Sequence, residues 1–392
     1  MRLAISIATT LALATGAQAQ SVPCGGPFGD FVAGLKRQAA RQGYSDRAID
    51  GFFRTVRHDP RTIRADRAQG VFQLDFLAFS RRIISQNRIE NGQRNSRKWD
   101  GVFDAIERQL GVPRGVLLAF WALETDYGQV QGDFNTANSL VTLAHDCRRP
   151  ELFRPQVFAA LELYERGDFD PAETTGAWAG EIGMVQMLPG DILEHGTDGD
   201  GDGHVRLKTS APDALVSGAQ MLRGMGWRAN EPWLQEVVIP RDLDWAETGL
   251  DHRKSVADWA RLGVRARNGT LGPAGLPASV LLPMGRKGPA FLAYPNFRVF
   301  FEWNRSFVYV TTAAYFATRL SGAPVYDPGT PDPGLDGAQM KALQRKLIAH
   351  GYDVGGVDGI LGERTRAAVQ REQIRLGLPA DSWPTLDLLN RL

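Results

Sequence analysis

Apolar residues recur at helical spacing over much of the N-terminal half of the chain. Their spacing predicts helices that include residues 31–35, 70–77 and 99–110. A Gly-Val-Pro sequence at 111–113 then interrupts the pattern, and a proline at this point is typical of a new helix start. The sequence therefore predicts a helical N-terminal region divided by short breaks.

The next predicted helix runs from Arg114 to about Thr125. Its apolar side consists of Val116, Leu117, Ala119, Phe120 and Leu123. Glu124 lies at the end of this helix, on or beside the apolar stripe.

Further along the chain the pattern becomes mixed. Helices are predicted around 152–166 and 212–225 from the same spacing. Residues 263–289 are rich in Gly and Pro and predict a loop, and a short β-rich run is expected at 297–301. The expected fold class is α+β, mainly α.

A Pro/Gly-rich segment predicts the main domain boundary. Residues 321–334 contain repeated Pro and Gly and are typical of a semi-rigid linker. We therefore expect one large domain at 20–320 and one small domain at 335–392, the latter with helical spacing of its own.

The extreme N-terminus has the three parts of a secretory signal peptide. Arg2 supplies the positive charge, residues 3–13 are apolar, and Ala17 and Ala19 form a small-x-small cleavage pattern. The apolar stretch is too short for a membrane-spanning helix; the alternative is a buried N-terminal helix. We expect cleavage after Ala19 and a soluble, exported, periplasmic protein without a membrane span.

Composition excludes some classes of protein but does not decide whether the two cysteines are paired. The 392 residues are 43% hydrophobic and carry a formal net charge of +1, which argues against disorder and against nucleic-acid binding by a general basic field. Cys24 and Cys147 either form one disulfide or remain two unrelated thiols, and export favours the disulfide. Six scattered His and no Cys-x-x-Cys argue against zinc.

Glu124 is the candidate catalytic acid. A carboxyl group beside an apolar stripe is partly desolvated, which raises its pKa and lets it donate a proton near neutral pH. The alternative is a helix-end Glu paired with an Arg. Asp126 could be a second carboxylate, but it lies two residues further on and points about 200° around the helix from Glu124.

An aspartate cluster resembles the start of an EF-hand loop. Asp198, Asp200 and Asp202 occupy positions 1, 3 and 5, and Gly203 occupies position 6. Three carboxylates this close repel one another unless a hard cation neutralises them. We therefore expect a weakly bound structural Ca²⁺, the alternative being a solvated Asp/Gly turn.

The downstream part of this loop departs from the EF-hand pattern. His204, at position 7, is expected to contribute only its backbone carbonyl. Position 12 is Thr209 instead of a bidentate Glu. Asp213 is the nearest acid beyond it and is the candidate that closes a longer loop.

Several motifs together resemble one family. They are Glu124-Thr-Asp-Tyr-Gly128, Ser139-Leu-Val-Thr-Leu-Ala144, Arg148-Arg149 with Leu152-Phe153, the glycine-rich segment 176–189, Asp200-Gly-Asp-Gly-His204 and Trp303-Asn-Arg-Ser306. In this order they resemble lytic murein transglycosylases of the membrane-bound type B, in a soluble form, over residues 31–320. The resemblance implies a lysozyme-like catalytic domain.

The resemblance also implies a reaction. Glu124 would act as the single general acid and base, cleaving the β-1,4 bond between N-acetylmuramic acid and N-acetylglucosamine without water and leaving 1,6-anhydro ends. The substrate's N-acetyl group would stabilise the cationic centre. Two alternatives stay open: a non-catalytic peptidoglycan-binding scaffold and a hydrolytic muramidase.

The same resemblance implies a set of substrate-binding residues. They are Arg148, Arg149, Gln186, Asn304 and Tyr309. The Arg pair would bind carboxylates of the substrate unless it is a surface pair, and Tyr309 would line the sugar track unless it belongs to the core. Trp303 stands where the family commonly has Tyr, which would remove a hydrogen bond to sugar.

The C-terminal region resembles a second family. Residues 340–369 have the Leu, Gly and Asp spacing of the small three-helix peptidoglycan-binding domain. Such a domain would raise the local enzyme concentration at the cell wall. Peptidoglycan glycan strands are the expected partner, other cell-wall enzymes are candidates, and we expect a monomer with no organic cofactor.

Overall fold

Helices form most of the structure, a computed structural model that describes residues 22–68 and 74–392. The expected fold class, mainly α with a small β part, is confirmed. The predicted signal peptide and the first residues of the helix predicted at 70–77 lie outside the described residues. No helix within the described residues is long and apolar enough to cross a membrane.

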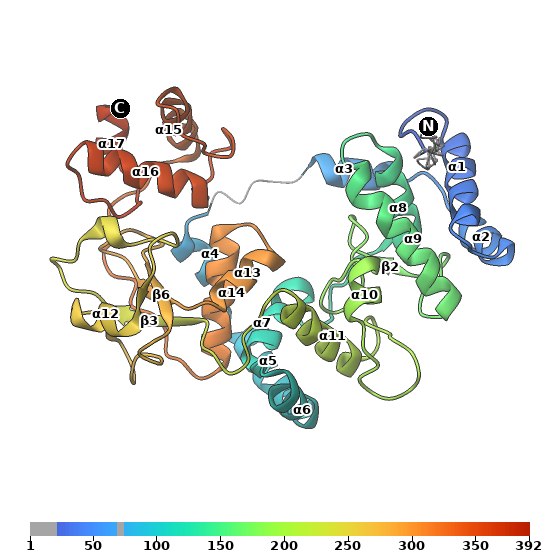
Figure 1. The fold of residues 1–392 in the computed structure, drawn as a ribbon, viewed down its shortest axis with the longest axis horizontal. Coiled ribbons are helices and arrows are strands. Elements are labelled where there is room, and N and C mark those ends of the chain that lie inside the picture. The colour runs from blue at the N-terminus through green and yellow to red at the C-terminus, as the bar shows by residue number, and fades with distance from the viewer. Residues whose placement is uncertain (1–21, 69–73) are drawn as a thin grey trace, which may run out of the picture.

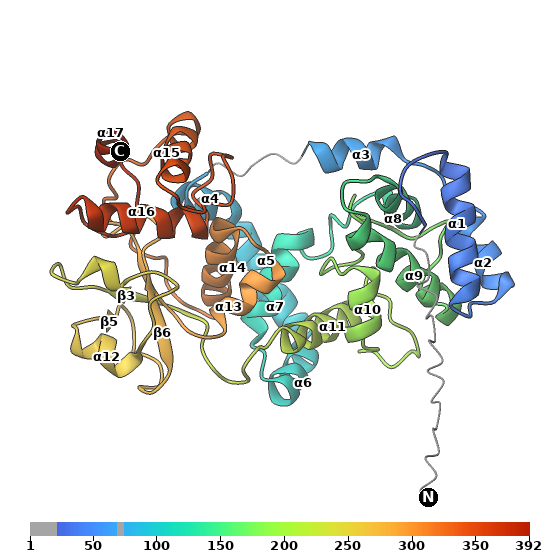
Figure 2. The same cartoon turned by 45° about the horizontal axis from the view of Figure 1, so that its top comes forward.

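One lobe, on the right in Figures 1 and 2, has its own apolar core. Its elements are α1 (Phe28–Arg41), α2 (Asp46–Phe53), α3 (Pro60–Arg67), α8 (Thr136–His145), α9 (Pro150–Arg166) and α10 (Pro189–His195), with the antiparallel pair β1 (Phe134–Asn135) and β2 (Thr175–Gly176). Cys24 and Cys147 form a disulfide with their Cα atoms 5.3 Å apart, so the predicted bridge is confirmed.

A second group of helices forms the centre of the molecule. It comprises α4 (Phe76–Ile83), α5 (Gln86–Lys98), α6 (Asp100–Leu110), α7 (Arg114–Thr125), α11 (Ala211–Gly224), α13 (Phe297–Trp303) and α14 (Phe307–Leu320). Most residues of α7 are buried, as expected for a helix that is apolar all round. α7 packs along α14, which brings the end of α7 near the start of α14.

A five-stranded antiparallel sheet follows α11, with strand order β4-β6-β7-β3-β5. Its elements are β3 (Leu234–Val238), the 3-10 helix η1 (Trp245–Glu247), β4 (Lys254–Ser255), α12 (Val256–Arg261), β5 (Arg265–Ala266), β6 (Pro277–Leu281) and β7 (Ala290–Ala293). Two sequence predictions were wrong here. The predicted loop at 263–289 contains β5 and β6, and the run expected to be β-rich at 297–301 is helical, within α13.

The C-terminal module, which we define as α15 (Gly337–Ala349), α16 (Glu363–Arg375) and α17 (Leu386–Arg391), has a small apolar core. In Figures 1 and 2 its helices lie over one end of the sheet region. Gln370 of α16 donates hydrogen bonds to the Trp245 and Thr248 carbonyls, at 3.1 and 2.9 Å. The module is therefore docked on the large domain.

The segment expected to be a linker is also held in place. Tyr326 is buried and its hydroxyl lies 2.8 Å from the Ser80 hydroxyl. Asp332 pairs with Lys287 at 2.6 Å and accepts, at its carbonyl, a hydrogen bond from the Trp383 indole at 2.9 Å. The segment expected to be a semi-rigid linker is therefore fixed to the large domain and to the C-terminal module by these contacts.

Candidate active site

Glu124 is the second-last residue of α7, and the helix ends abruptly after it. Asp126, Tyr127 and Gly128 all have positive φ, at 51°, 61° and 86°. Such left-handed conformations are rare for non-glycine residues and end helices. The chain therefore turns away just beyond Glu124.

Thr125 joins the end of α7 to the glycine-rich segment. Its hydroxyl donates to the Met184 carbonyl at 2.6 Å and accepts from the Gly128 backbone amide at 2.9 Å. Thr125 thus holds the turn after α7 and the glycine-rich segment together beside Glu124.

Asp126 forms an ion pair with the neighbouring helix α5. Its carboxylate accepts a hydrogen bond from Arg88 Nε at 3.0 Å. The hydroxyl of Tyr127 donates to the Arg88 carbonyl at 2.7 Å. Both residues therefore anchor α7 to α5, in agreement with the expectation that Asp126 points away from Glu124.

The two oxygens of the Glu124 carboxyl group have different surroundings. Oε1 accepts hydrogen bonds from the Trp303 indole at 3.0 Å and from the Tyr309 hydroxyl at 2.5 Å. Oε2 accepts no hydrogen bond from any described residue. One oxygen is thus held by two protein donors, and the other has no donor within the described chain.

The pKa of Glu124 is raised, mainly because burial disfavours the charged form. The hydrogen bonds from Tyr309 and Trp303 oppose this shift because they stabilise the carboxylate, whereas the negative charge of Glu181 adds to it. Burial has the largest effect of the three, so the surroundings favour the protonated form of Glu124, as the sequence predicts.

Tyr309 and Trp303 are placed by the junction of α13 and α14. Trp303 stacks on Phe120 of α7 with ring centroids 4.2 Å apart. Trp303 was expected to represent a lost contact to sugar, but its indole instead contacts the catalytic candidate. Tyr309 also contacts Glu124 directly, a role that the sequence did not predict.

Asn304 lies in the turn between these two donors. Its side-chain oxygen accepts from the Ser306 backbone amide at 2.9 Å, and the Ser306 hydroxyl caps α14 by accepting from Tyr309 N at 3.4 Å. The amide nitrogen of Asn304 donates to no acceptor among residues 22–68 and 74–392. It is therefore available for a substrate carbonyl.

Gln186 lies in the glycine-rich segment with a φ of 54°. Its side-chain nitrogen donates to the Gly183 carbonyl at 2.8 Å and to the Gln131 carbonyl at 3.4 Å. The structure therefore gives Gln186 a role in holding the segment's shape.

Glu181 is a residue of the site that sequence reasoning missed. One oxygen of its carboxyl group is buried and has no hydrogen-bond partner in the described chain. Burial raises the pKa of Glu181, and Arg149 opposes that shift. The sequence did contain a signal for this residue, because Glu181 is an acidic residue between Gly180 and Ile182 in an otherwise apolar segment.

Arg148 and Arg149 share a buried partner. Arg148 Nη1 contacts one carboxylate oxygen of Asp66 at 2.5 Å, and Arg149 contacts the other carboxylate oxygen of Asp66. The Asp66 side chain is buried, with 1% exposed. The pair is therefore more than a simple surface pair, and each guanidinium keeps N–H donors beyond its bond to Asp66. Arg149 still acts electrostatically on Glu181, which in turn acts on Glu124.

The acidic loop forms a compact cluster apart from Glu124. Asp198, Asp200 and Asp202 each place one carboxylate oxygen within 4.8 Å of the others. Backbone amides of the loop donate to Asp198 and lower its pKa, so it is anionic. The His204 ring contacts Asp168 through Nδ1 at 2.8 Å.

Asp213 differs from its expected role. It is 0% exposed, and its two oxygens accept from the Gly199 and Arg206 backbone amides at 2.9 and 2.7 Å. It is not among the three residues whose oxygens converge. Asp213 therefore closes the loop by hydrogen bonding, because both of its oxygens are directed at the backbone.

Comparison with protein families gives two matches. The family described as Transglycosylase SLT domain matches residues 27–318, and the family described as Putative peptidoglycan binding domain matches residues 336–392. Among curated proteins, the chain is 23% identical over 232 residues to membrane-bound lytic murein transglycosylase B of Escherichia coli K12. The match covers 59% of this chain and 63% of that protein, less than two thirds of its length.

Solved structures give a consistent result. SltB3 from Pseudomonas aeruginosa, in complex with NAG-anhNAM-pentapeptide, is 34% identical with a TM-score of 0.85, covering 94% of this chain and 99% of its own. The Escherichia coli lytic transglycosylase SLT35, in complex with calcium, is 21% identical with a TM-score of 0.63, covering 78% and 97%; this likeness concerns the fold alone. The chain therefore belongs to the lytic murein transglycosylases of type B, with a lysozyme-like fold and a C-terminal peptidoglycan-binding domain.

Proposed function

We propose that the protein cleaves the β-1,4 bond between N-acetylmuramic acid and N-acetylglucosamine without water, with Glu124 as the only general acid and base. The observation that carries the proposal is the asymmetry of the Glu124 carboxyl group. Oε1 accepts hydrogen bonds from Trp303 and Tyr309, whereas Oε2 has no donor within the described chain.

This asymmetry determines which oxygen carries the proton. An indole N–H can only donate, so Trp303 requires an acceptor on Oε1 in both protonation states of Glu124. The acidic proton therefore resides on Oε2, where the glycosidic oxygen can receive it. The raised pKa keeps this proton bound above the ordinary range of a Glu.

The reaction then has two proton transfers. In the first, Glu124 Oε2 protonates the leaving oxygen, the bond from muramoyl C1 to that oxygen breaks, and the acetamido group of the substrate stabilises the positive C1. Asn304 Nδ2, which has no acceptor within the described chain, would bind an acetamido carbonyl. In the second, the Glu124 carboxylate takes the proton of the C6 hydroxyl while O6 bonds to C1, which yields the anhydro end and restores the acid.

Product analysis of digested sacculi by mass spectrometry tests this proposal. Anhydro-muropeptides are expected; reducing ends would instead favour a hydrolytic muramidase, and intact sacculi a binding scaffold. Glu124→Gln is expected to reduce cleavage at least ~10³-fold while binding to sacculi persists, because the amide cannot donate an acidic proton.

Asp126→Asn is the matched control for Glu124→Gln. Because Asp126 is engaged by Arg88, this variant is expected to retain most of the cleavage activity. Release of anhydro products by the Glu124→Gln variant would remove the basis for assigning the acid to this residue.

We also propose that Asp198, Asp200 and Asp202, with the carbonyl of His204, hold a structural Ca²⁺. Three converging carboxylates provide the oxygen ligands that Ca²⁺ prefers. Asp213 would stabilise the loop by its backbone bonds without touching the ion.

Removal of Ca²⁺ is expected to lower the free energy of unfolding. For a weak site with a dissociation constant of about 10⁻⁴–10⁻³ M, 1 mM Ca²⁺ adds roughly 0.4–1.4 kcal/mol. Thermal unfolding with EDTA and with added Ca²⁺ measures this difference. Asp200→Asn should abolish the dependence, whereas an unchanged Ca²⁺ response in that variant would contradict the ligand set.

We further propose that the protein is exported to the periplasm and acts there on peptidoglycan strands. The disulfide supports this, because such bonds persist in oxidising compartments. Cell fractionation, with determination of the mature N-terminus, tests the expected cleavage after Ala19.

A further inference from the structure

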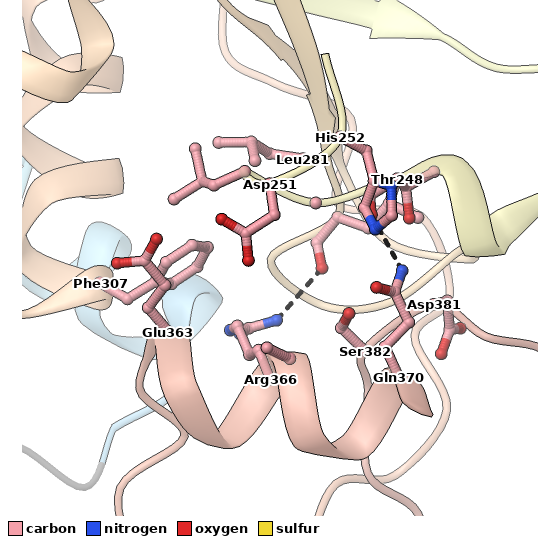
Figure 3. A pocket seen from close by; sticks show the side chains of 14 residues that line it. Thr248, Asp251, His252, Leu281, Phe307, Glu363, Arg366, Gln370, Asp381 and Ser382 are labelled. Carbon is pink, nitrogen blue, oxygen red and sulfur yellow. Dashed lines mark hydrogen bonds between the residues drawn. The ribbon is translucent and has the colours of Figure 1, made fainter. Parts of the chain in front are cut away.

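The C-terminal module contacts the helix that carries Tyr309. Arg366 of α16 is only 8% exposed and extends into a pocket between the module and the large domain. Figure 3 shows Arg366 and Gln370 pointing from α16 into this pocket, with Phe307, Glu363 and Asp251 around it.

Arg366 is held by contacts that use the plane of its guanidinium group. Its Cζ lies 4.3 Å from the centre of the Phe307 ring, a cation–π distance. Its Nη atoms donate to the Leu282 carbonyl at 3.4 Å and to the Pro283 carbonyl at 2.7 Å. The guanidinium is therefore fixed to the loop after β6 and lies over Phe307.

Arg366 forms no ion pair with a carboxylate of the described chain. The acidic groups around it are Glu363 and Asp251, which line the same pocket, and Asp381, which acts on it electrostatically. A buried charge is costly without such a pair. Of the two aromatic rings near its guanidinium group, Phe307 is the closer at 4.3 Å, whereas the centre of the Trp383 ring lies at 5.9 Å.

The helix geometry connects Phe307 to the catalytic candidate. Phe307 is the first residue of α14 and Tyr309 lies two residues later, so the two side chains point about 200° apart around the helix. The first turn of α14 is therefore held between Arg366 on one face and Glu124 on the other.

We propose that Arg366 is a positioning residue for the general acid: by packing on Phe307 it holds the first turn of α14 so that the Tyr309 hydroxyl stays on Glu124 Oε1. This inference rests on the proposed function of Glu124. Arg366, through its packing on Phe307, would then be required for full activity even on a soluble substrate that needs no anchoring at the wall.

The test compares Arg366→Met with Gln370→Ala. Methionine keeps most of the side-chain length but removes the guanidinium group that packs on Phe307. Gln370→Ala removes two hydrogen bonds that dock α16 but leaves the packing on Phe307. The substrate is soluble glycan strands bearing stem peptides, and the readout is the initial rate of anhydro-end formation as a function of pH.

Arg366→Met is expected to lower kcat about tenfold with little change in KM. It should also move the alkaline limb of the rate profile upward by about 0.5–1 pH unit, because a weaker Tyr309 bond stabilises the Glu124 carboxylate less. The other groups that act on Glu124, Trp303 and Glu181, are unchanged in this variant. Gln370→Ala should keep the wild-type profile.

A wild-type profile for Arg366→Met, or the same change in both variants, would overturn the proposal. If Arg366→Met does not fold, Phe307→Leu provides the same test with Arg366 intact, and an upward shift is again expected. A wild-type enzyme that releases no anhydro ends would instead overturn the proposed function itself, so the two failures are distinguishable.

Discussion

At the scale of single residues, three opposing effects set the acidity of Glu124. Burial raises its pKa, two donors on Oε1 lower it, and the Glu181 charge raises it again. A catalytic acid must be protonated in order to donate, so activity is lost as pH rises through this pKa. Loss of a hydrogen-bond donor (Tyr309 or Trp303) and loss of the Glu181 charge should therefore move the alkaline limb of the pH–rate profile in opposite directions.

Tyr309→Phe and Glu181→Gln test this balance as a pair. Tyr309→Phe removes a donor to the carboxylate, so the pKa of Glu124 rises and the alkaline limb moves up by about 1–2 pH units. Glu181→Gln removes a nearby negative charge, so that pKa falls and the limb moves down. The measurement is kcat/KM against pH on soluble glycan strands.

Arg88→Lys is a suitable control for this pair, because Arg88 pairs with Asp126 and is not among the groups that shift the pKa of Glu124. The alkaline limb of the pH–rate profile of Arg88→Lys should coincide with that of the wild type. Shifts of the same sign in Tyr309→Phe and Glu181→Gln would refute this account of the acid.

At the scale of elements, the close packing of α7 on α14 determines where Glu124 lies. Gly115 permits this approach: a Cβ at this position would lie 2.7 Å from the Ala317 carbonyl and 2.2 Å from the Ser321 hydroxyl. Even an alanine would have to separate the two helices or displace the end of α14.

Gly115→Ala is therefore expected to destabilise the protein by about 1–3 kcal/mol, through overpacking of a buried helix contact. Urea unfolding measures the change. Gly101→Ala is the matched control, since a Cβ there meets no atom within 4 Å, and the better helix propensity of Ala should leave stability equal or slightly higher. Equal destabilisation of both variants would contradict the packing argument.

The same elements indicate what the sequence could predict. α7 was predicted nearly to the residue, because an apolar helix between a proline break and a sharp turn has a strong local pattern. Residues 297–301 were wrongly expected to be β-rich, because Phe and Val favour strands in isolation. In the structure Phe297 and Phe300 are buried in the central core, and this tertiary packing selects the helix.

The site was predictable to a similar extent. Glu124 was identified because it lies on an apolar stripe within a recognisable motif. The Trp303 contact could not be predicted, since it joins residues 179 positions apart and depends on stacking against Phe120. Asp213 was expected to close the loop at the ion, and spacing in the sequence does not reveal that each of its oxygens accepts from a backbone amide.

At the scale of the whole molecule, the site lies where two cores meet. Met184 and Trp303 each pack against both the core of the N-terminal lobe and the central core. Glu124 comes from a central helix, whereas Glu181 precedes Ile182 of the lobe's core. The geometry around the acid therefore depends on the lobe remaining intact.

The disulfide is the covalent tie of this lobe. It closes a loop with a sequence separation of 123 residues, beside backbone contacts such as Gly25 N to the His145 carbonyl at 2.8 Å. A bridge over a loop of this length stabilises a fold by typically about 2–4 kcal/mol, chiefly by restricting the unfolded chain.

Cys24→Ser combined with Cys147→Ser is therefore expected to lower the free energy of unfolding by about 2–4 kcal/mol. Because neither cysteine touches Glu124, Trp303 or Tyr309, cleavage by the folded variant should match the wild type well below its unfolding temperature. Calorimetric unfolding with and without a reductant provides the measurement, and the reductant should affect only the wild type. A double variant that unfolds at the wild-type temperature, or that is inactive while folded, would show that the bridge does not act on the lobe in this way.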